Sequence, residues 1–272
     1  MTFWLYLPFY CQRKPTRIIG NRYRLMRQIG RGSSGLVHLA VDVKTRARYA
    51  VKEVCRPWSR HSLLESNILK QVGPHKNIIQ LIDVIQDSDS MFLVMEMAKQ
   101  GTVMDIVPHS LTKPYSNTQC RHFFKQLLDA VDHLHQHDII HRDIKPENIL
   151  LSNQTIKLVD FGSATRISEK TSSHIGSPAF MAPELLKKVP HNPTSCDVWA
   201  MGVTLYCLAY GHLPFQKPNF VQLYQDILTQ PVSHTDTIDV QLKDLINQLL
   251  QKDPTQRITL DEAKVHPWMT KK

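Results

Sequence analysis

Apolar and polar residues alternate along the first third of the chain, in a pattern typical of β-strands. Val37, Leu39 and Val41 recur at every second position, and "RYAVKEV" and "MFLVMEM" are further short runs of strand type. One segment, "RHSLLESNILKQV", instead carries its apolar residues at helical spacing. The pattern predicts a small sheet-rich part with a single helix between about Tyr23 and Glu96.

The apolar pattern becomes helical from about Ser116. Ser116 and Gln119 have the spacing of a capping box, which favours a helix start. An apolar stripe at helical spacing follows: Phe124, Leu127, Leu128, Val131 and Leu134. The run "VWAMGVTLYCLAYG" is too short to span a membrane and is typical of a buried helix closed by Gly211. The segment "AKQG", residues 98–101, is a candidate hinge between the two parts.

Composition narrows the class of protein. The chain has 272 residues, 42 % of them apolar, which is enough to bury a core in one large domain or in two lobes. The net charge is +9, but the basic residues form no long run and do not interleave with aromatic residues, which argues against nucleic-acid binding. The five cysteines are scattered without a C-x-x-C pair, which favours a reducing compartment. We therefore expect a cytoplasmic protein, with access to the nucleus left open.

The N-terminal residues 1–21 form a separate feature. The apolar "MTFWLYLPFYC" precedes the basic "QRKPTR", the reverse of the order in a secretory signal. The run is about half the length that a membrane span needs, and Pro8 interrupts it. We therefore expect no transmembrane segment. Two interpretations remain, an extension that lies on the body of the protein and an interfacial membrane anchor.

Three glycines with G-x-G-x-x-G spacing, Gly30, Gly32 and Gly35, allow three interpretations. They could open a dinucleotide-binding fold, form a flap over nucleotide phosphates, or mark a plain hairpin turn. A dinucleotide fingerprint requires a helix after the glycines, whereas here a strand pattern follows. The phosphate flap and the plain turn remain.

Downstream polar residues favour the phosphate flap. Lys52 lies in an otherwise apolar strand and needs an anionic partner, for which Glu65 on the next helix is a candidate. The segment "HRDIKPENILL" then brings Asp143, Lys145 and Asn148 within six residues. Phosphoryl transfer requires such a set: an acceptor for the attacking hydroxyl, a cation for the phosphate and an oxygen ligand for Mg²⁺. Asp160, in "KLVDFGSA", is a candidate second metal ligand.

With these residues in place, the chain resembles a eukaryotic protein kinase. The resemblance includes the glycine loop, "AVK", "HRDIKPEN", "DFG", "APE", "DVWAMG" and "HPW", in that order. It implies an α+β, two-lobed fold with a small antiparallel sheet lobe of about 22–97, a hinge of about 98–101 and a helical lobe of about 102–269. The protein kinase domain would span 22–269, and residues 270–272 would be a tail.

The resemblance also implies that ATP and Mg²⁺ are the cofactors and assigns roles to residues. Lys52, braced by Glu65, would hold the α- and β-phosphates. The remaining nucleotide-binding positions would be Ile29, Gly30, Arg31, Gly32, Ser33, Ser34, Gly35, Val37, Ala50, Met95 as gatekeeper, Glu96, Ala98 and Leu150.

In the large lobe the resemblance makes Asp143 the catalytic base and lets Lys145 hold the γ-phosphate. Asn148 and Asp160 would bind Mg²⁺. Lys145, two residues after Asp143, resembles serine/threonine rather than tyrosine kinases. Two further pairs are given structural interpretations. Glu184 and Arg257 resemble an ion pair of the large lobe, and His133 and His137, although spaced as metal ligands can be, lie at a helix end.

Finer features resemble calcium/calmodulin-dependent protein kinase kinases and the related upstream kinases of AMP-activated protein kinase. These features are "EMAKQGTVMDIVP", "GSPAFMAPELL" and "GVTLYCLAYGHLPF". The resemblance implies that the protein substrate is another kinase, phosphorylated on an activation-loop threonine. Thr102 stands where arginine-selecting kinases carry an acidic residue, so we expect no strong basic-motif preference, although Glu147 remains as one acidic contact.

Two departures separate the chain from the calmodulin-dependent group. Only "EVCRPWSRHSLL" separates Lys52 from Glu65, where that group has a long insert, and only four residues follow Trp268. Calmodulin is therefore not an expected partner of this chain.

Two questions stay open at the level of sequence. The activation segment offers Thr171, Ser172 and Ser173 as phosphosites that could pair with Arg142, and the alternative is a loop ordered without phosphate. Ser177 is expected to hold Asp143 and Lys145. As for function, an active serine/threonine kinase is the main hypothesis. The alternatives are a kinase of another subfamily, a pseudokinase scaffold and a nucleic-acid or membrane-surface binder.

Overall fold

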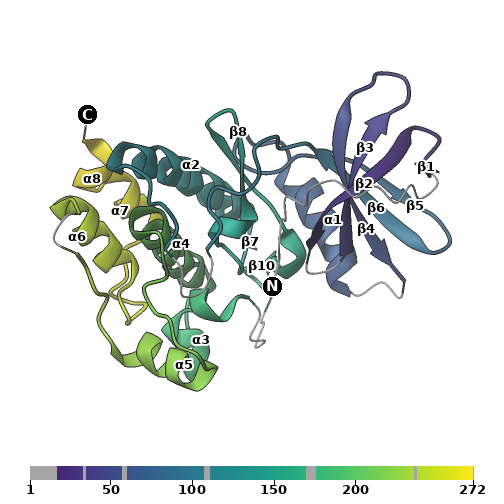
Figure 1. Ribbon diagram of the computed structural model, residues 1–272. Coiled ribbons are helices and arrows are strands. Elements are labelled where there is room, and N and C mark those ends of the chain that lie inside the picture. Colours follow the sequence, from purple (N-terminus) through teal and green to yellow (C-terminus); the bar gives the residue numbers. More distant parts are fainter. Residues whose placement is uncertain are drawn as a thin grey trace.

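The computed structural model describes residues 17–32, 35–56, 60–106, 111–169, 176–235 and 238–271 of the chain. They form a sheet lobe and a helical lobe, seen at opposite ends of Figure 1. This arrangement confirms the predicted α+β, two-lobed fold class.

The small lobe is one antiparallel sheet of six strands with the order β1-β2-β3-β4-β6-β5. Its strands are β1 (Ile18–Ile19), β2 (Tyr23–Gly32), β3 (Gly35–Asp42), β4 (Arg48–Cys55), β5 (Leu81–Gln86) and β6 (Ser90–Glu96). The helix α1 (Arg60–Val72) interrupts them, with the bounds that the apolar periodicity predicts.

The two faces of this sheet contact different parts of the protein. One face buries a small apolar cluster that includes Tyr23, Leu25 and Phe92. The other face carries Lys52, whose ammonium group reaches Asp160 of the large lobe. Side chains alternate between faces along a strand, so the period-two pattern of β4 decides which residues look into the interlobe cleft.

The large lobe is mostly helical. Its helices are α2 (Asn117–Gln136), α3 (Pro183–Lys187), α4 (Pro193–Tyr210), α5 (Phe220–Thr229), α6 (Val240–Leu249), α7 (Leu260–Val265) and α8 (Pro267–Thr270). Short strands β7 (Ile139–Ile140), β8 (Ile149–Ser152), β9 (Thr155–Leu158) and β10 (Thr165–Arg166) and the 3₁₀ turns η1 (Pro146–Asn148), η2 (Phe161–Ser163) and η3 (Pro178–Phe180) lie between α2 and α3.

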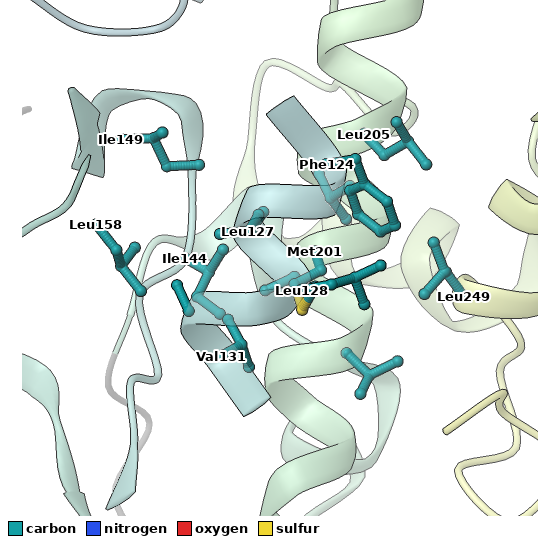
Figure 2. Packing of buried hydrophobic residues seen from close by; sticks show 14 of the residues in the cluster. Phe124, Leu127, Leu128, Val131, Ile144, Ile149, Leu158, Met201, Leu205 and Leu249 are labelled. Carbon is teal, nitrogen blue, oxygen red and sulfur yellow. The ribbon is translucent and has the colours of Figure 1, made fainter. Parts of the chain in front are cut away.

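The core of the large lobe lies between α2, α4 and α6. Figure 2 shows Phe124, Leu127 and Leu128 of α2 facing α4, with Leu249 of α6 on the far side. Ile144 and Ile149 extend this core to the loop that carries the polar motif, so burial of these aliphatic residues anchors the loop on both sides.

Helix ends in this lobe follow the sequence signals. Ser116 and Gln119 form the predicted capping box at the start of α2. Gly211 ends α4 at φ 76°, and a Cβ at this position would lie 1.9 Å from the Thr112 carbonyl oxygen. Only glycine fits here, because both the backbone conformation and the close approach exclude a side chain.

Two further features concern membrane-spanning helices and cysteines. Within the described ranges, no helix is both long and apolar enough to cross a bilayer. The cysteines of the described residues, Cys55, Cys120, Cys196 and Cys207, are free thiols.

Candidate active site

The polar loop between β7 and β8 fixes one carboxylate, that of Asp143, with donors on both oxygens. Oδ1 accepts hydrogen bonds from the backbone N–H and the hydroxyl of Ser177, both at 2.9 Å. Oδ2 accepts from Lys145 Nζ at 2.8 Å and from Asn148 Nδ2 at 2.9 Å. A carboxylate held by four donors, one of them cationic, has a fixed orientation.

Ser177 occupies the position that the sequence predicts for it. Its hydroxyl also accepts a hydrogen bond from Lys145 Nζ at 2.7 Å, so it links Asp143 to Lys145. Asp143 and Lys145 therefore lie side by side, in the geometry required of a proton acceptor and a phosphate-binding cation.

A second charged cluster joins the two lobes. Lys52 Nζ donates to both carboxylate oxygens of Glu65 at 2.8 Å and to Asp160 Oδ1 at 2.9 Å. Burial lowers the pKa of Lys52, but the two carboxylates outweigh it and hold the pKa above its usual value. For Asp160, burial raises the pKa and Lys52 more than compensates, so the carboxyl is ionised. The expected Lys52–Glu65 pair is thus present.

The glycine segment lies on the hairpin of β2 and β3. Gly30 pairs with Val37, Arg31 with Leu36, and Gly32 with Gly35. A Cβ on Gly35 would lie 2.1 Å from the Glu53 carbonyl oxygen, so this position needs glycine for close strand packing. Ser33 and Ser34 lie outside the described residues. A strand follows the glycines, as the phosphate-flap interpretation requires.

The expected adenine-site residues of the small lobe share one sheet face. Val37 lies opposite Lys52, and Ala50 lies opposite Met95. Since Ala50 and Lys52 are two residues apart, all four side chains point to the face that looks toward Asp160. Ile29 is partly buried on β2.

The remaining expected nucleotide positions lie at the hinge. Ala98 follows β6 and is partly buried, and Leu150 of β8 forms a bridge with Thr102. The Glu96 side chain is already engaged by Lys157 Nζ at 2.7 Å and by the Gln80 N–H at 2.9 Å. The Glu96 backbone N–H also donates to the Gln80 carbonyl oxygen at 3.0 Å, so the adenine contact expected of this backbone stays a prediction.

One buried atom fits the expected magnesium site. Asn148 Nδ2 donates to the backbone and the side chain of Asp143, but Asn148 Oδ1 is buried and has no hydrogen-bond partner. An unpaired buried acceptor is costly, and an oxygen-preferring cation would satisfy it. In the described part of the chain no three His, Cys, Asp or Glu residues converge on a metal position.

Comparison with known proteins agrees with this geometry. The family model described as "Protein kinase domain" matches residues 23–269. The chain belongs to the protein kinase family. The fold, the order of the motifs and the catalytic-loop geometry are those that the sequence resemblance implies.

Relatives place this kinase among serine/threonine kinases. It is 34 % identical to calcium/calmodulin-dependent protein kinase kinase cmkC of Emericella nidulans, over 92 % of this chain and 58 % of the relative. It is 36 % identical to the serine/threonine-protein kinase stk11 homolog of Dictyostelium discoideum, over 96 % of this chain and 47 % of the relative. Probable serine/threonine-protein kinase MARK-A of the same organism is 35 % identical, over 94 % of this chain and 25 % of the relative.

The chain thus spans between a quarter and three fifths of the length of these relatives. These similarities confirm that the chain is a serine/threonine-type protein kinase. The calcium/calmodulin-dependent protein kinase kinases are among the groups that it resembles.

An acidic residue that sequence reasoning did not single out organises the catalytic loop of this kinase. Asp197, fully buried on α4, accepts hydrogen bonds from the backbone N–H groups of His141 and Arg142, both at 2.9 Å, and from His135 Nε2 at 3.0 Å. Burial raises the pKa of Asp197, but the hydrogen bond and charge of His135 lead the opposing contributions and hold it below its usual range. The sequence contained a signal for this role, because Asp197 is a single acidic residue within an apolar helix.

Backbone strain is present in this loop and at the start of η2. Arg142 has φ 65° and Asp160 has φ 61°, both left-handed. Non-glycine residues adopt this region at a cost of about 1–3 kcal/mol, so neighbouring contacts must hold them there. For Arg142 these contacts include Asp197 and a hydrogen bond from Nε to the Ser163 carbonyl oxygen at 2.6 Å.

Two further kinase features match their structural interpretations. Arg257 Nη1 and Nη2 bind Glu184 Oε1 and Oε2 at 2.6 and 2.9 Å, with both side chains buried. His133 Nε2 lies 3.0 Å from the Val72 carbonyl oxygen, and His137 Nδ1 lies 2.7 Å from the His133 carbonyl oxygen. Neither ring is therefore poised as a metal ligand.

The activation segment is described only in part. The candidate phosphosites Thr171, Ser172 and Ser173 lie outside the described residues. Arg142 Nη1, the group that a phosphate there could reach, is buried and lacks a hydrogen-bond partner among the described residues.

Proposed function

We propose that this chain is an active serine/threonine kinase that uses Mg-ATP and phosphorylates activation-loop threonines of other protein kinases. The kinase family implies ATP as the phosphate donor. The single observation that carries catalytic competence is the Asp143 carboxylate, held by Lys145, Asn148 and Ser177. A pseudokinase, which transfers no phosphate, would not need this complete set of contacts around Asp143.

The residues divide the work of phosphoryl transfer. Asp143 accepts the proton of the attacking hydroxyl while the oxygen of that hydroxyl bonds to the γ-phosphorus. ADP leaves with the bridging oxygen. Lys145, now shared between Asp143 and Ser177, turns to the γ-phosphate and so frees Asp143 Oδ2 to accept the proton. Lys52 exchanges its contact with Asp160 for the α- and β-phosphates while Glu65 keeps it in place.

Asn148 and Asp160 are the residues that would hold Mg²⁺. The unpaired Asn148 Oδ1 and the Asp160 carboxylate supply the hard oxygen ligands that this ion prefers. When bound, Mg²⁺ neutralises charge on the β- and γ-phosphate oxygens.

Two observations support a protein kinase as the substrate. One relative is by name a protein kinase kinase, cmkC, although MARK-A is as similar in sequence. The second observation is local. Thr102, at the position where an acid would select arginine, is uncharged, and its hydroxyl donates to Asp105 Oδ1 at 2.5 Å. A substrate chosen by its fold, rather than by a basic motif, is consistent with this arrangement.

The test uses a catalytically dead AMP-activated protein kinase domain as the acceptor, with Mg-ATP. A matched acceptor carries alanine in place of its activation-loop threonine, and the Asp143→Asn enzyme is the control for contaminating activity. We expect phosphate only on the threonine acceptor and only with the unaltered enzyme.

Other outcomes separate the parts of the proposal. Labelling of generic serine and threonine peptides but not of the kinase domain would refute the upstream role and keep the kinase. Appreciable turnover by the Asp143→Asn enzyme would refute the assigned base. ATP binding without labelling of any acceptor would refute catalytic competence of this chain.

A further inference from the structure

Positive charge is concentrated in the first strands of the small lobe. Residues 17–56 contain ten Arg and Lys residues but only two acidic ones, whereas the whole chain has 33 basic and 24 acidic residues. Nearly all of the net charge of +9 therefore belongs to β1–β4 and their turns.

Five of these residues gather at one end of the sheet, which we call the basic tip: Arg22, Arg24, Lys44, Arg46 and Arg48. The turn after β1 and the turn after β3 meet there, since the Val43 N–H donates to the Arg22 carbonyl oxygen at 2.9 Å. Arg24 lies opposite Val41, which lies opposite Arg48. Two strand spacings separate Arg24 from Arg48, about 10 Å on the same face.

Little negative charge offsets the basic tip. Asp42 is the acidic residue that binds the basic tip, and its side chain is 1 % exposed. Its carboxylate binds Arg22 Nε at 2.6 Å and the backbone N–H groups of Lys44 and Thr45 at 2.8 and 3.0 Å. Asp42 therefore shapes the turn and neutralises one arginine, while within the described part of the chain no salt bridge involves the other four residues.

Exposed apolar side chains lie among these charges. Ile18 of β1 is directly opposite Arg24 and is 47 % exposed. Met26, two residues after Arg24 on β2, is 45 % exposed. Ile18 and Arg24 share one face because they are cross-strand partners, and Met26 lies beside them where the register of β2 shifts between Leu25 and Gln28. Interleaved basic and apolar groups match the boundary between lipid headgroups and acyl chains.

We propose that the basic tip, together with Ile18 and Met26, is a docking surface for an anionic phospholipid membrane. Single-stranded nucleic acid would instead require exposed aromatic rings for base stacking. The tyrosines nearest to the tip are turned inward, because Tyr23 is fully buried and packs edge-on against Tyr49 at 5.4 Å.

The sequence that precedes β1 supports the same occupant. Residues 1–16 contain the apolar, aromatic run "TFWLYLPFY" followed by "QRKPT". Aromatic and basic residues together are the composition of interfacial anchors, and stable attachment takes two weak signals rather than one. The basic tip supplies the electrostatic signal, and this run supplies an apolar one.

The experiment measures sedimentation of the whole chain with lipid vesicles. Vesicles of phosphatidylcholine are compared with vesicles that contain about 30 % phosphatidylserine, at about 0.05 M and 0.5 M salt. The tip variant combines Lys44→Gln, Arg46→Gln and Arg48→Gln. The control variant removes the same charge from exposed lysines elsewhere, through Lys70→Gln, Lys113→Gln and Lys187→Gln. Melting temperature and ATP binding of both variants verify the fold.

We expect salt-sensitive binding to the phosphatidylserine vesicles only. Each basic residue at an anionic surface is worth roughly five-fold in affinity, so the tip variant should bind about a hundred-fold more weakly and the control variant nearly normally. The measurement needs no kinase activity and is independent of the proposed function.

Four results would overturn the proposal. They are equal binding to both vesicle types, unchanged binding of the tip variant, an equal loss in the control variant, and binding that disappears on deletion of residues 1–16 but survives in the tip variant. An oligonucleotide that binds through the tip while vesicles do not would assign the surface to nucleic acid instead.

Discussion

Replacing Asp197 with asparagine tests how the catalytic loop is held in its strained conformation. The carboxylate accepts three hydrogen bonds, from the His141 and Arg142 N–H groups and from His135 Nε2. Asparagine keeps the size but has one accepting oxygen, and its amide group must face one of these donors. The variant therefore removes hydrogen bonds without creating a cavity.

The expected loss follows from the contacts. A buried donor left without a partner costs about 1–3 kcal/mol, and hydrogen bonds to an ionised acceptor are worth about 1.5–3 kcal/mol. With the amide oxygen toward His141 and His135, one backbone donor, that of Arg142, is lost. We expect the free energy of unfolding to fall by about 2–4 kcal/mol. The released N–H lets Arg142 leave φ 65°, which displaces the adjacent Asp143.

Urea unfolding and steady-state kinetics check the two consequences separately. A displacement of Asp143 by about 1 Å can cost about a hundred-fold in kcat. The KM for ATP should change little, because Lys52 and the hinge do not contact Asp197. Asp129→Asn is the matched control, since Asp129 forms an exposed ion pair with Lys76 whose loss costs below about 1 kcal/mol.

An unfolding free energy of Asp197→Asn within about 0.5 kcal/mol of the unaltered chain, with kcat within about two-fold, would refute this reasoning. A fall in stability with unchanged kcat would refute the positioning role alone.

Four other changes have distinct expected outcomes. Lys52→Arg should lower kcat/KM by at least about a hundred-fold in a peptide assay, because the planar guanidinium does not fit between two carboxylates arranged around an ammonium. Glu184→Gln should lower the free energy of unfolding by about 3–5 kcal/mol in urea, since it leaves the buried Arg257 unpaired, and the double variant with Arg257→Met should cost less than the sum of the single changes. Gly35→Ala should raise the KM for ATP, because the new Cβ would meet a β4 carbonyl oxygen at 2.1 Å and move the hairpin, whereas an unchanged KM would contradict the close approach. Burial lowers the pKa of Lys252 to about 8, so above pH 8 the unfolded chain binds more protons than the folded chain. In urea unfolding, the free energy of unfolding should therefore rise from about pH 8 to 10 relative to that of Lys252→Met. Parallel pH curves for the two proteins would refute this prediction.

Local sequence patterns were sufficient for most of the secondary structure. The bounds of α1 and the capping box of α2 follow from apolar spacing and from side chains that bind backbone within one turn. The identities of the catalytic-loop residues were equally readable, because Asp143, Lys145 and Asn148 lie close together in the chain and their chemistry is specific to phosphoryl transfer.

Long-range contacts were less accessible. The sequence proposed Glu65 as the partner of Lys52, but not the third member, Asp160, which lies 108 residues away. Asp197 was present in a quoted motif, yet its three hydrogen bonds depend on how α4 packs against the loop after β7. The dispersed arginines gave no sign of a patch, because strand register and two turns bring them together.

The sequence by itself determined which elements form and which chemical groups are available, because both depend on neighbours within a few residues. The tertiary structure decided which groups meet, which oxygen is left unpaired and where charge accumulates. Those outcomes depend on packing between segments that are distant in the chain. Asn148 illustrates the division: its amide was evident from the motif, but only packing around Asp143 leaves Oδ1 buried and open to a cation.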